Sequence, residues 1–296
     1  MSWAALLTAI GIIALLSLGL SRLKQQNKRL AARIIEVDEM KKNFISHVSH
    51  ELKAPLASMR ETTHLMLERI PGPLTDKQKR LLDLNLQSGE RLAQMLGNIL
   101  DLSRLQAGIA EYDMQLSDIT DLMRGVVFEL SAQARQRPLR ILADIQREPL
   151  MVECDPHRMV QLFTNLLQNA IRFSNKGGSI GVHIKSLSQL PHMPQSAHAR
   201  VSTTKAPAGF ALIGISDSGP GIEDRHKETV FHTFHQTKQG KKSHGESLGL
   251  GLAISRAVAE AHQGTIWVED NPSGGAIFYV LLPRAADEIE SFAQAS

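Results

Sequence analysis

One histidine in the N-terminal part of the chain has neighbours suited to a nucleophile. His50 is followed directly by Glu51, within the run Ser49-His50-Glu51-Leu52-Lys53-Ala54-Pro55-Leu56. On a helix, the carboxylate can accept from one ring nitrogen, fix the tautomer and leave the other nitrogen as a nucleophile. Pro55 removes a backbone donor and loosens the helix just past this pair. A solvated surface pair is the alternative, and the two residues alone do not exclude it.

A second polar group occupies one predicted helix, in the run Asn165-Leu166-Leu167-Gln168-Asn169-Ala170-Ile171-Arg172-Phe173. Asn165, Asn169 and Arg172 are spaced by four and three residues, so they share one helix face. Amide oxygens suit a hard cation such as Mg²⁺, and a guanidinium suits a triphosphate. An ordinary polar helix face has the same spacing and remains open at this point.

Two glycine motifs follow. Asp217 comes directly after a strand-like run and opens the motif Asp217-Ser218-Gly219-Pro220-Gly221-Ile222. Its glycines would let the backbone approach a flat ligand while the carboxylate accepts from an amino group. The second motif, Gly249-Leu250-Gly251-Leu252, opens a predicted helix, where free N–H groups suit phosphate. Either motif alone is a weak signal, because such turns also occur without a ligand.

The segment between the glycine motifs, Glu223–Leu248, is charged and polar. Phe231 and Phe234 are its main apolar residues, and we expect them to anchor it. Its position between two candidate phosphate and base contacts predicts a lid that closes over a nucleotide. A loop without function is the alternative.

The elements that must position these residues begin with an apolar stretch. No charged residue precedes Arg22, and about 20 apolar or small residues in a helix span a bilayer. Residues 1–21 are therefore predicted to be a single transmembrane anchor in the plasma (inner) membrane. Arg22, Lys24, Lys28 and Arg29 follow it, which places the rest of the chain in the cytoplasm. A cleaved signal peptide is disfavoured, because no positive charge precedes the stretch.

Residues 22–43 predict a signalling helix or linker with heptad spacing. Residues 44–110 predict a helical hairpin, with a turn at Ile70–Thr75, Thr75 as N-cap and the second helix ending near Gly108. Such a hairpin cannot bury both apolar faces alone, so we expect an all-α homodimeric four-helix bundle.

Residues 115–286 predict an α/β sandwich with helices on one face of the sheet, followed by a tail at 287–296. Ser186–Gly209 reads as a surface loop without chemistry. The expected elements are helices near Ile119–Arg135 and Pro156–Phe173 and strands at Ile141–Ile145, Ile180–Ile184, Phe210–Ser216, Thr265–Glu269 and Ala276–Leu282.

The bulk composition excludes some classes. The 296 residues carry a net charge of only +3, which does not favour direct nucleic-acid binding. Cys154 is the single cysteine, so the chain has no intramolecular disulfide and no CxxC metal cluster. A buried structural thiol is the better interpretation of Cys154.

In this order the motifs resemble the transmembrane sensor histidine kinases of bacterial two-component systems, over residues 38 to 284. These have a HisKA-type dimerisation and phosphoacceptor domain and a GHKL-type ATP-binding domain. The resemblance implies that His50 is phosphorylated from ATP, with Glu51 assisting, and that Mg²⁺ is held by Asn169 with Asn165. It implies that the nucleotide is bound by Asn165, Asn169, Arg172, Phe173, Asp217, Gly219, Gly221, Ile222, Phe231, Phe234, Gly249, Leu250, Gly251 and Leu252.

The resemblance further implies a homodimer that passes the phosphoryl group to an aspartate of a response regulator receiver domain. His47 is a rival acceptor, but only His50 is followed by the Glu-Leu-Lys-x-Pro pattern. Ala54 stands where relatives often carry Thr or Asn to align water, which puts phosphatase activity in doubt. Two other functions stay open: an ATPase or serine kinase on the same nucleotide fold, and a silent scaffold that binds ATP and a partner.

Overall fold

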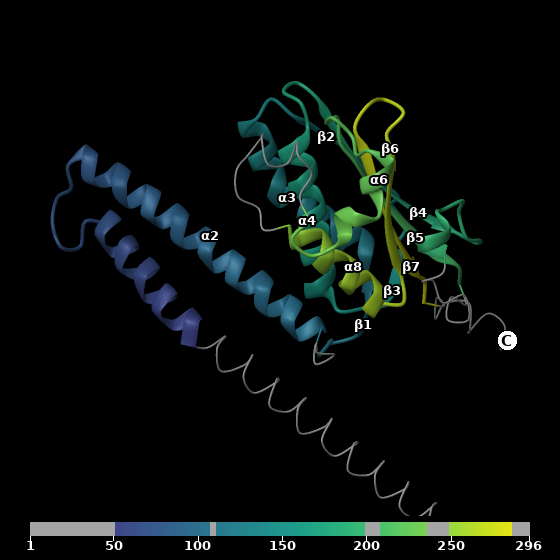
Figure 1. Cartoon of the computed structure of the whole chain (residues 1–296), viewed down its shortest axis with the longest axis horizontal. Helices are drawn as coiled ribbons and strands as arrows, with labels where there is room; N and C mark the ends of the chain where they lie inside the picture. The colour runs from purple at the N-terminus through teal and green to yellow at the C-terminus, as the bar shows by residue number, and fades with distance from the viewer. Residues whose placement is uncertain (1–50, 107–110, 199–207, 236–248, 286–296) are drawn as a thin grey trace, which may run out of the picture. The chain divides into compact units, whose positions relative to one another are not determined.

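The computed structural model describes residues 51–106, 111–198, 208–235 and 249–285 (Figure 1). The predicted anchor 1–21, the linker 22–43, His50 and the tail 287–296 lie outside the described residues, as do residues 236–248 of the predicted lid. Over the described ranges, no helix is both long and apolar enough to cross a bilayer. Contacts divide the chain into a helical unit and an α/β unit, with the boundary in the last turns of α2.

The helical unit is a hairpin of a helix over residues 51–67 and α2 (Asp76–Gln106). Thr75 caps α2 as predicted. Its Oγ1 accepts from the Gln78 amide at 3.3 Å, and Gln78 Oε1 accepts from the Thr75 amide at 2.9 Å. This reciprocal pair is a capping box, and it satisfies amides that the first turn of a helix leaves unpaired.

Large apolar side chains remain exposed along both hairpin helices in the single chain. They are Leu52, Met59, Leu65, Met66, Leu81, Leu84, Leu92 and Ile99. Exposure on this scale marks a surface that another molecule covers. It supports the expected four-helix bundle, which stays a prediction because the structure holds one chain.

The α/β unit contains a five-stranded sheet in the order β2-β4-β5-β7-β6. Its strands are β2 (Arg140–Ile145), β4 (Ser179–Leu187), β5 (Phe210–Ser216), β6 (Thr265–Asp270) and β7 (Ala276–Pro283). β2 and β4 are parallel, and the other neighbours are antiparallel.

Three helices cover one face of this sheet (Figure 1): α3 (Ile119–Gln136), α4 (Pro156–Phe173) and α8 (Gly251–Ala261). Alternate residues of the strands, such as Ile213, Ile215 and Val280, are fully buried against them. The predicted α/β sandwich is therefore confirmed.

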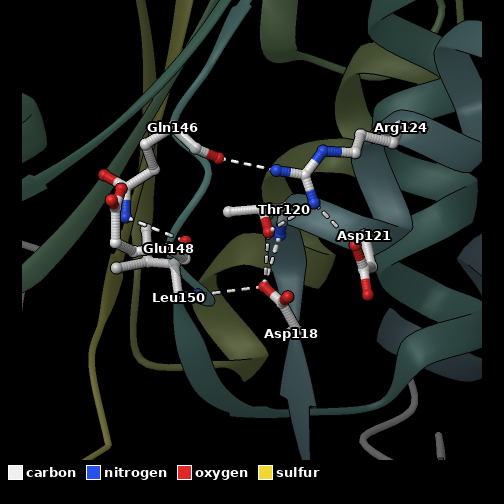
Figure 2. Close-up of polar contacts among 7 residues, drawn as sticks. All are labelled: Asp118, Thr120, Asp121, Arg124, Gln146, Glu148 and Leu150. Atoms are coloured by element: carbon white, nitrogen blue, oxygen red, sulfur yellow. Dashed lines mark hydrogen bonds and ion pairs between the residues drawn. The ribbon is translucent and has the colours of Figure 1, made fainter.

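A two-stranded antiparallel sheet, β1 (Gln115–Asp118) with β3 (Met151–Cys154), is an addition that the sequence patterns did not predict. Asp118 ends β1 and caps α3 (Figure 2). Its Oδ1 accepts from the Thr120 amide and the Leu150 amide, both at 2.9 Å. Burial raises the pKa of Asp118, but these hydrogen bonds outweigh it and the net pKa is lowered.

The opposite face of the sheet is covered in part by a segment predicted to be a plain surface loop. β4 extends to Leu187, and a short helix, α5 (Gln195–His198), follows. Met193 and Ala197 pack with Phe210, Trp267 and Leu281 in a second apolar cluster. The loop prediction was wrong for this part, because spaced apolar residues among the polar ones bury against the sheet.

One row of residues crosses this outer face in register: Asp144, His183, Gly214, Tyr279 and Trp267. The imidazole of His183 lies over Gly214, where a Cβ would come within 2.1 Å of the ring. The His183 and Tyr279 ring centroids are 5.8 Å apart, and Tyr279 stacks on Trp267 at 5.2 Å. The missing side chain of Gly214 therefore leaves the space that the His183 ring occupies.

Candidate active site

Helix α4 carries the asparagine motif on the side opposite to its buried stripe. Asp155 caps the helix by accepting from the Arg158 amide at 3.1 Å, and Pro156 occupies its first turn. Asn165, Asn169 and Arg172 remain partly exposed, as the spacing predicted. The buried stripe consists of Met159, Leu162, Phe163, Leu166, Leu167, Ala170 and Ile171.

Asn165 joins α4 to the second glycine motif. Its Nδ2 donates to the carbonyl of Gly251 at 3.4 Å, and a Cβ at Gly251 would lie 3.7 Å from the Asn165 amide carbon. Helix α8 begins at Gly251 rather than Gly249, because Gly249 has a φ of +67° and belongs to the preceding turn. Leu250 is buried and Leu252 partly buried beside it.

Asp217 ends β5 as predicted and is 6% exposed. Its Oδ1 accepts from the Gly219 amide at 2.8 Å and from the Ala276 amide at 3.3 Å. These two bonds orient the carboxyl group and leave Oδ2 for another donor. Burial raises the pKa of Asp217, and the two amides counteract that rise only in part.

Two residues of the turn between β6 and β7 also lie against Asp217, and the sequence interpretation missed them. Asn271 Nδ2 donates to the carbonyl of Asp217 at 2.9 Å. Gly275 has a φ of +100°, and a Cβ there would lie 2.1 Å from the same carbonyl oxygen. The run Asn271-Pro272-Ser273-Gly274-Gly275 between two predicted strands was the available signal. It predicts a turn, but it does not predict the contact of that turn with Asp217.

The first glycine motif also packs on the C-terminal end of α4. A Cβ at Gly219 would lie 2.6 Å from the carbonyl of Phe173, so only glycine fits there. Asn175 Nδ2 donates to the Ser218 carbonyl at 2.7 Å. Gly221 has a φ of +75°, and Ile222 beside it is partly exposed. The Arg172 guanidinium lies 5.4 Å from the Phe173 ring centroid.

The described start of the predicted lid forms two short helices, α6 (Asp224–Lys227) and η2 (Thr229–Phe231). Phe231 is an apolar anchor as expected: it is buried, it meets Phe278 edge-on, and the Arg256 guanidinium lies 5.8 Å from its centroid. Arg256 also pairs with Glu228 at 2.9 Å.

Phe234 is 63% exposed, so the prediction that it anchors the segment through its side chain was wrong. The reason lies in the backbone. Phe234 has a φ of +60°, and its amide donates to the Gly249 carbonyl at 3.1 Å. This bond brings the residues that flank segment 236–248 side by side.

These contacts group motifs that are distant in the chain. α4 meets the second glycine motif through Asn165 and the first through Phe173. A partly exposed row of amide and guanidinium groups thus runs between the buried carboxyl group of Asp217 and the start of α8. Such a surface suits a purine nucleotide with its phosphates at the helix start.

Comparison with known proteins agrees with this geometry. Residues 154–286 match the family described as histidine kinase-, DNA gyrase B-, and HSP90-like ATPase. Residues 40–108 match the family described as His Kinase A (phospho-acceptor) domain. Together the two matches span more than half of the chain.

The chain is 32% identical over 261 residues to sensor histidine kinase TmoS of Ectopseudomonas mendocina, covering 88% of this chain and 25% of that one. It is 28% identical over 271 residues to sensor histidine kinase GlrK of Escherichia coli (strain K12), covering 90% of this chain and 52% of that one. The chain therefore spans about half or less of these relatives.

Solved structures share the fold. Full-length ShkA in complex with AMPPNP aligns with a TM-score of 0.64 at 23% identity, over 82% of this chain and 46% of that chain. Histidine kinase AdeS of Acinetobacter baumannii aligns with a TM-score of 0.52 at 20% identity, over 80% of this chain and 98% of that chain. The fold and both domain matches define a two-domain histidine kinase. The chain belongs to the sensor histidine kinase family.

Proposed function

We propose that this chain transfers the γ-phosphoryl group of ATP to His50 and then to an aspartate of a response regulator receiver domain. A bond forms between a ring nitrogen of His50 and the γ-phosphorus as the bond to the leaving ADP oxygen breaks. The observation that carries the proposal is the placement of α4, which contacts the second glycine motif through Asn165 and the first through the carbonyl of Phe173.

Asp217 is proposed to read the adenine. Its Oδ1 is held by the Gly219 and Ala276 amides, so Oδ2 can accept from the exocyclic amino group of the base. The start of α8 at Gly251 then provides free amides for the phosphates, with Arg172 on the adjoining face of α4. Asn271 and Gly275 support the carbonyl side of Asp217.

Asn165 and Asn169 are proposed to hold Mg²⁺. The donor set fits a hard cation: Asn165 turns its Nδ2 toward the Gly251 carbonyl, so its amide oxygen is the atom left for a ligand. Asn169 lies one helical turn further along the same partly exposed face. Bound Mg²⁺ would neutralise charge on the phosphates.

The test is labelling of the full-length protein with γ-³²P-ATP. We expect an acid-labile, base-stable phosphoryl label that His50→Gln abolishes and that the matched His47→Gln variant retains. Acid-stable label on serine or threonine would instead favour the serine kinase, and ATP binding without any label would favour the scaffold. Transfer to purified receiver domains completes the assay, because it reports the second step separately.

We propose further that residues 1–21 anchor the protein in the inner membrane as a single span and that the chain is a homodimer. The apolar stretch ending before Arg22 supports the first statement. The exposed apolar side chains of the hairpin support the second. Carbonate extraction of membranes that hold the protein with or without residues 1–21 tests the anchor. Amine-reactive crosslinking through lysines introduced into the hairpin tests the dimer.

A further inference from the structure

Histidine side chains gather where the described chain leads into segment 236–248. His226 lies in α6, and His232 and His235 follow η2. The rings of His226 and His235 have centroids 5.4 Å apart with an angle of 53° between their planes. Neither ring has a part in the proposed kinase reaction.

The contacts of Thr229 favour one tautomer of His235. Thr229 has one hydroxyl proton, and its Oγ1 lies 3.3 Å from the His226 carbonyl, which can only accept. The same Oγ1 lies 3.2 Å from His235 Nε2. In the tautomer in which the hydroxyl donates to the carbonyl, Nε2 carries a proton and donates to Thr229. Nδ1 of His235 is then the deprotonated nitrogen.

That Nδ1 atom is shielded from solvent and has no hydrogen-bond partner among the residues that the structure describes. A buried lone pair without a donor is costly and points to a ligand. Burial lowers the pKa of His235, and the charges of the nearby His226 and His232 lower it further. The ring is therefore in the neutral form in which imidazoles bind metal ions.

The spacing of the two rings fits a shared ion. With a Zn–N bond of about 2.1 Å, the ion lies about 3.2 Å from each imidazole centroid, so tetrahedral geometry puts two centroids about 5 Å apart. The observed 5.4 Å is close to this separation. Among the residues that the structure describes, no three His, Cys, Asp or Glu side chains converge on such a point. Within the part of the chain that the structure describes, the candidate site therefore consists of two imidazoles.

We propose that His226 and His235 together bind one divalent transition-metal ion of the zinc class. The ion would join α6 to the turn at Gly249, because His235 contacts that glycine closely: a Cβ there would lie 2.5 Å from the His235 carbonyl oxygen. Phe234 donates to the same glycine. Metal occupancy therefore holds together the two chain segments that flank 236–248, next to the second glycine motif. Any effect of the bound metal on nucleotide turnover rests on the proposed function, whereas metal binding itself does not.

The test is a Zn²⁺ titration of the full-length protein in detergent, with competition against a chromophoric chelator. We expect one site that His226→Gln and His235→Gln each weaken by about tenfold or more, since even outer partners of a metal ligand contribute 10- to 100-fold. His232→Gln is the matched control: it lies in the same turn and is exposed, and it should bind as the unmodified chain does.

Co²⁺ substitution gives a second readout, because binding to two imidazoles changes the visible absorption of the ion. We expect no such change with His226→Gln or His235→Gln. Circular dichroism confirms that each variant is folded. Equal Zn²⁺ affinity for the unmodified chain, His226→Gln and His235→Gln would overturn the proposal. A protein that binds Zn²⁺ at this pair but takes no label from ATP would instead leave the metal site standing and refute the kinase.

Discussion

The buried imidazole of His262 accepts a hydrogen bond from the backbone amide of Asp155 at 3.0 Å. Its other nitrogen, Nδ1, lies 2.7 Å from the Val258 carbonyl and donates to it. Asp155 caps α4 and His262 ends α8, so one neutral ring ties together the two helices that carry the asparagine and second glycine motifs. Protonation at Nε2 would place its N–H group against the backbone N–H group of Asp155, and the hydrogen bond between them would be lost.

Stability should therefore depend on pH through His262. Burial lowers its pKa in the folded state, so the unfolded chain binds the proton more readily. The stability that this contact provides is complete above the unfolded pKa of about 6.5 and is lost as pH falls below it. We expect the free energy of unfolding, measured with urea between pH 8 and 5 (roughly the range of histidine titration), to fall with acid. His262→Gln should lower stability at pH 8 and flatten the slope; an unchanged slope would contradict the assignment, since His183 and His235 titrate in both proteins.

Asp217→Asn should weaken ATP binding by about 10- to 100-fold, as expected when a buried acceptor is replaced by a donor. The amide oxygen can still accept from the Gly219 and Ala276 amides, so its NH₂ group faces the ligand where Oδ2 stood. Titration with a fluorescent ATP analogue measures the loss. The melting temperature serves as the control for folding, and full affinity would show that Asp217 does not read the base.

Gly214→Ala should destabilise the protein by about 1–3 kcal/mol, because overpacking forces neighbours to move. The new Cβ would meet the His183 ring. His183→Ala removes that ring, so the double variant should recover part of the loss. A double-mutant cycle from urea unfolding checks this, and strict additivity would argue against direct contact.

Ala54→Thr should increase phosphatase activity toward the phosphorylated receiver domain. Ala54 lies in the helix over residues 51–67 and is exposed, so a hydroxyl there can order a water molecule without a change in packing. Loss of phosphate from a purified receiver, followed with and without the variant kinase, measures the effect. Ala54→Val is the matched control, since it adds similar volume without a hydrogen-bonding group.

The sequence predicted the parts of the site that depend on local patterns. The amphipathic spacing of α4, the Thr75 cap and the position of Asp217 at a strand end were all read correctly, because each is set within a few residues. The contact of Asn165 with Gly251 and the support of Asp217 by Asn271 and Gly275 join distant segments, and no local pattern encodes them.

The same limit explains the errors. β1 and β3 are four residues each, and the Asp118 carboxylate that caps α3 also accepts from the amide of Leu150, which directly precedes β3 (Figure 2). Phe234 was expected to be an apolar anchor of the segment, whereas its side chain is exposed and its backbone amide donates to Gly249. Both outcomes follow from tertiary contacts that override local preference.

The stacked pair on the outer face of the sheet provides an optical reporter. The chain has two tryptophans, and Trp267 is 4% exposed against Tyr279 and the cluster that includes Met193 and Ala197. In a Trp3→Phe background, its emission wavelength reports solvent entry beneath α5 alone. Detachment of that segment can thus be timed separately from helix melting, with no label attached to the protein.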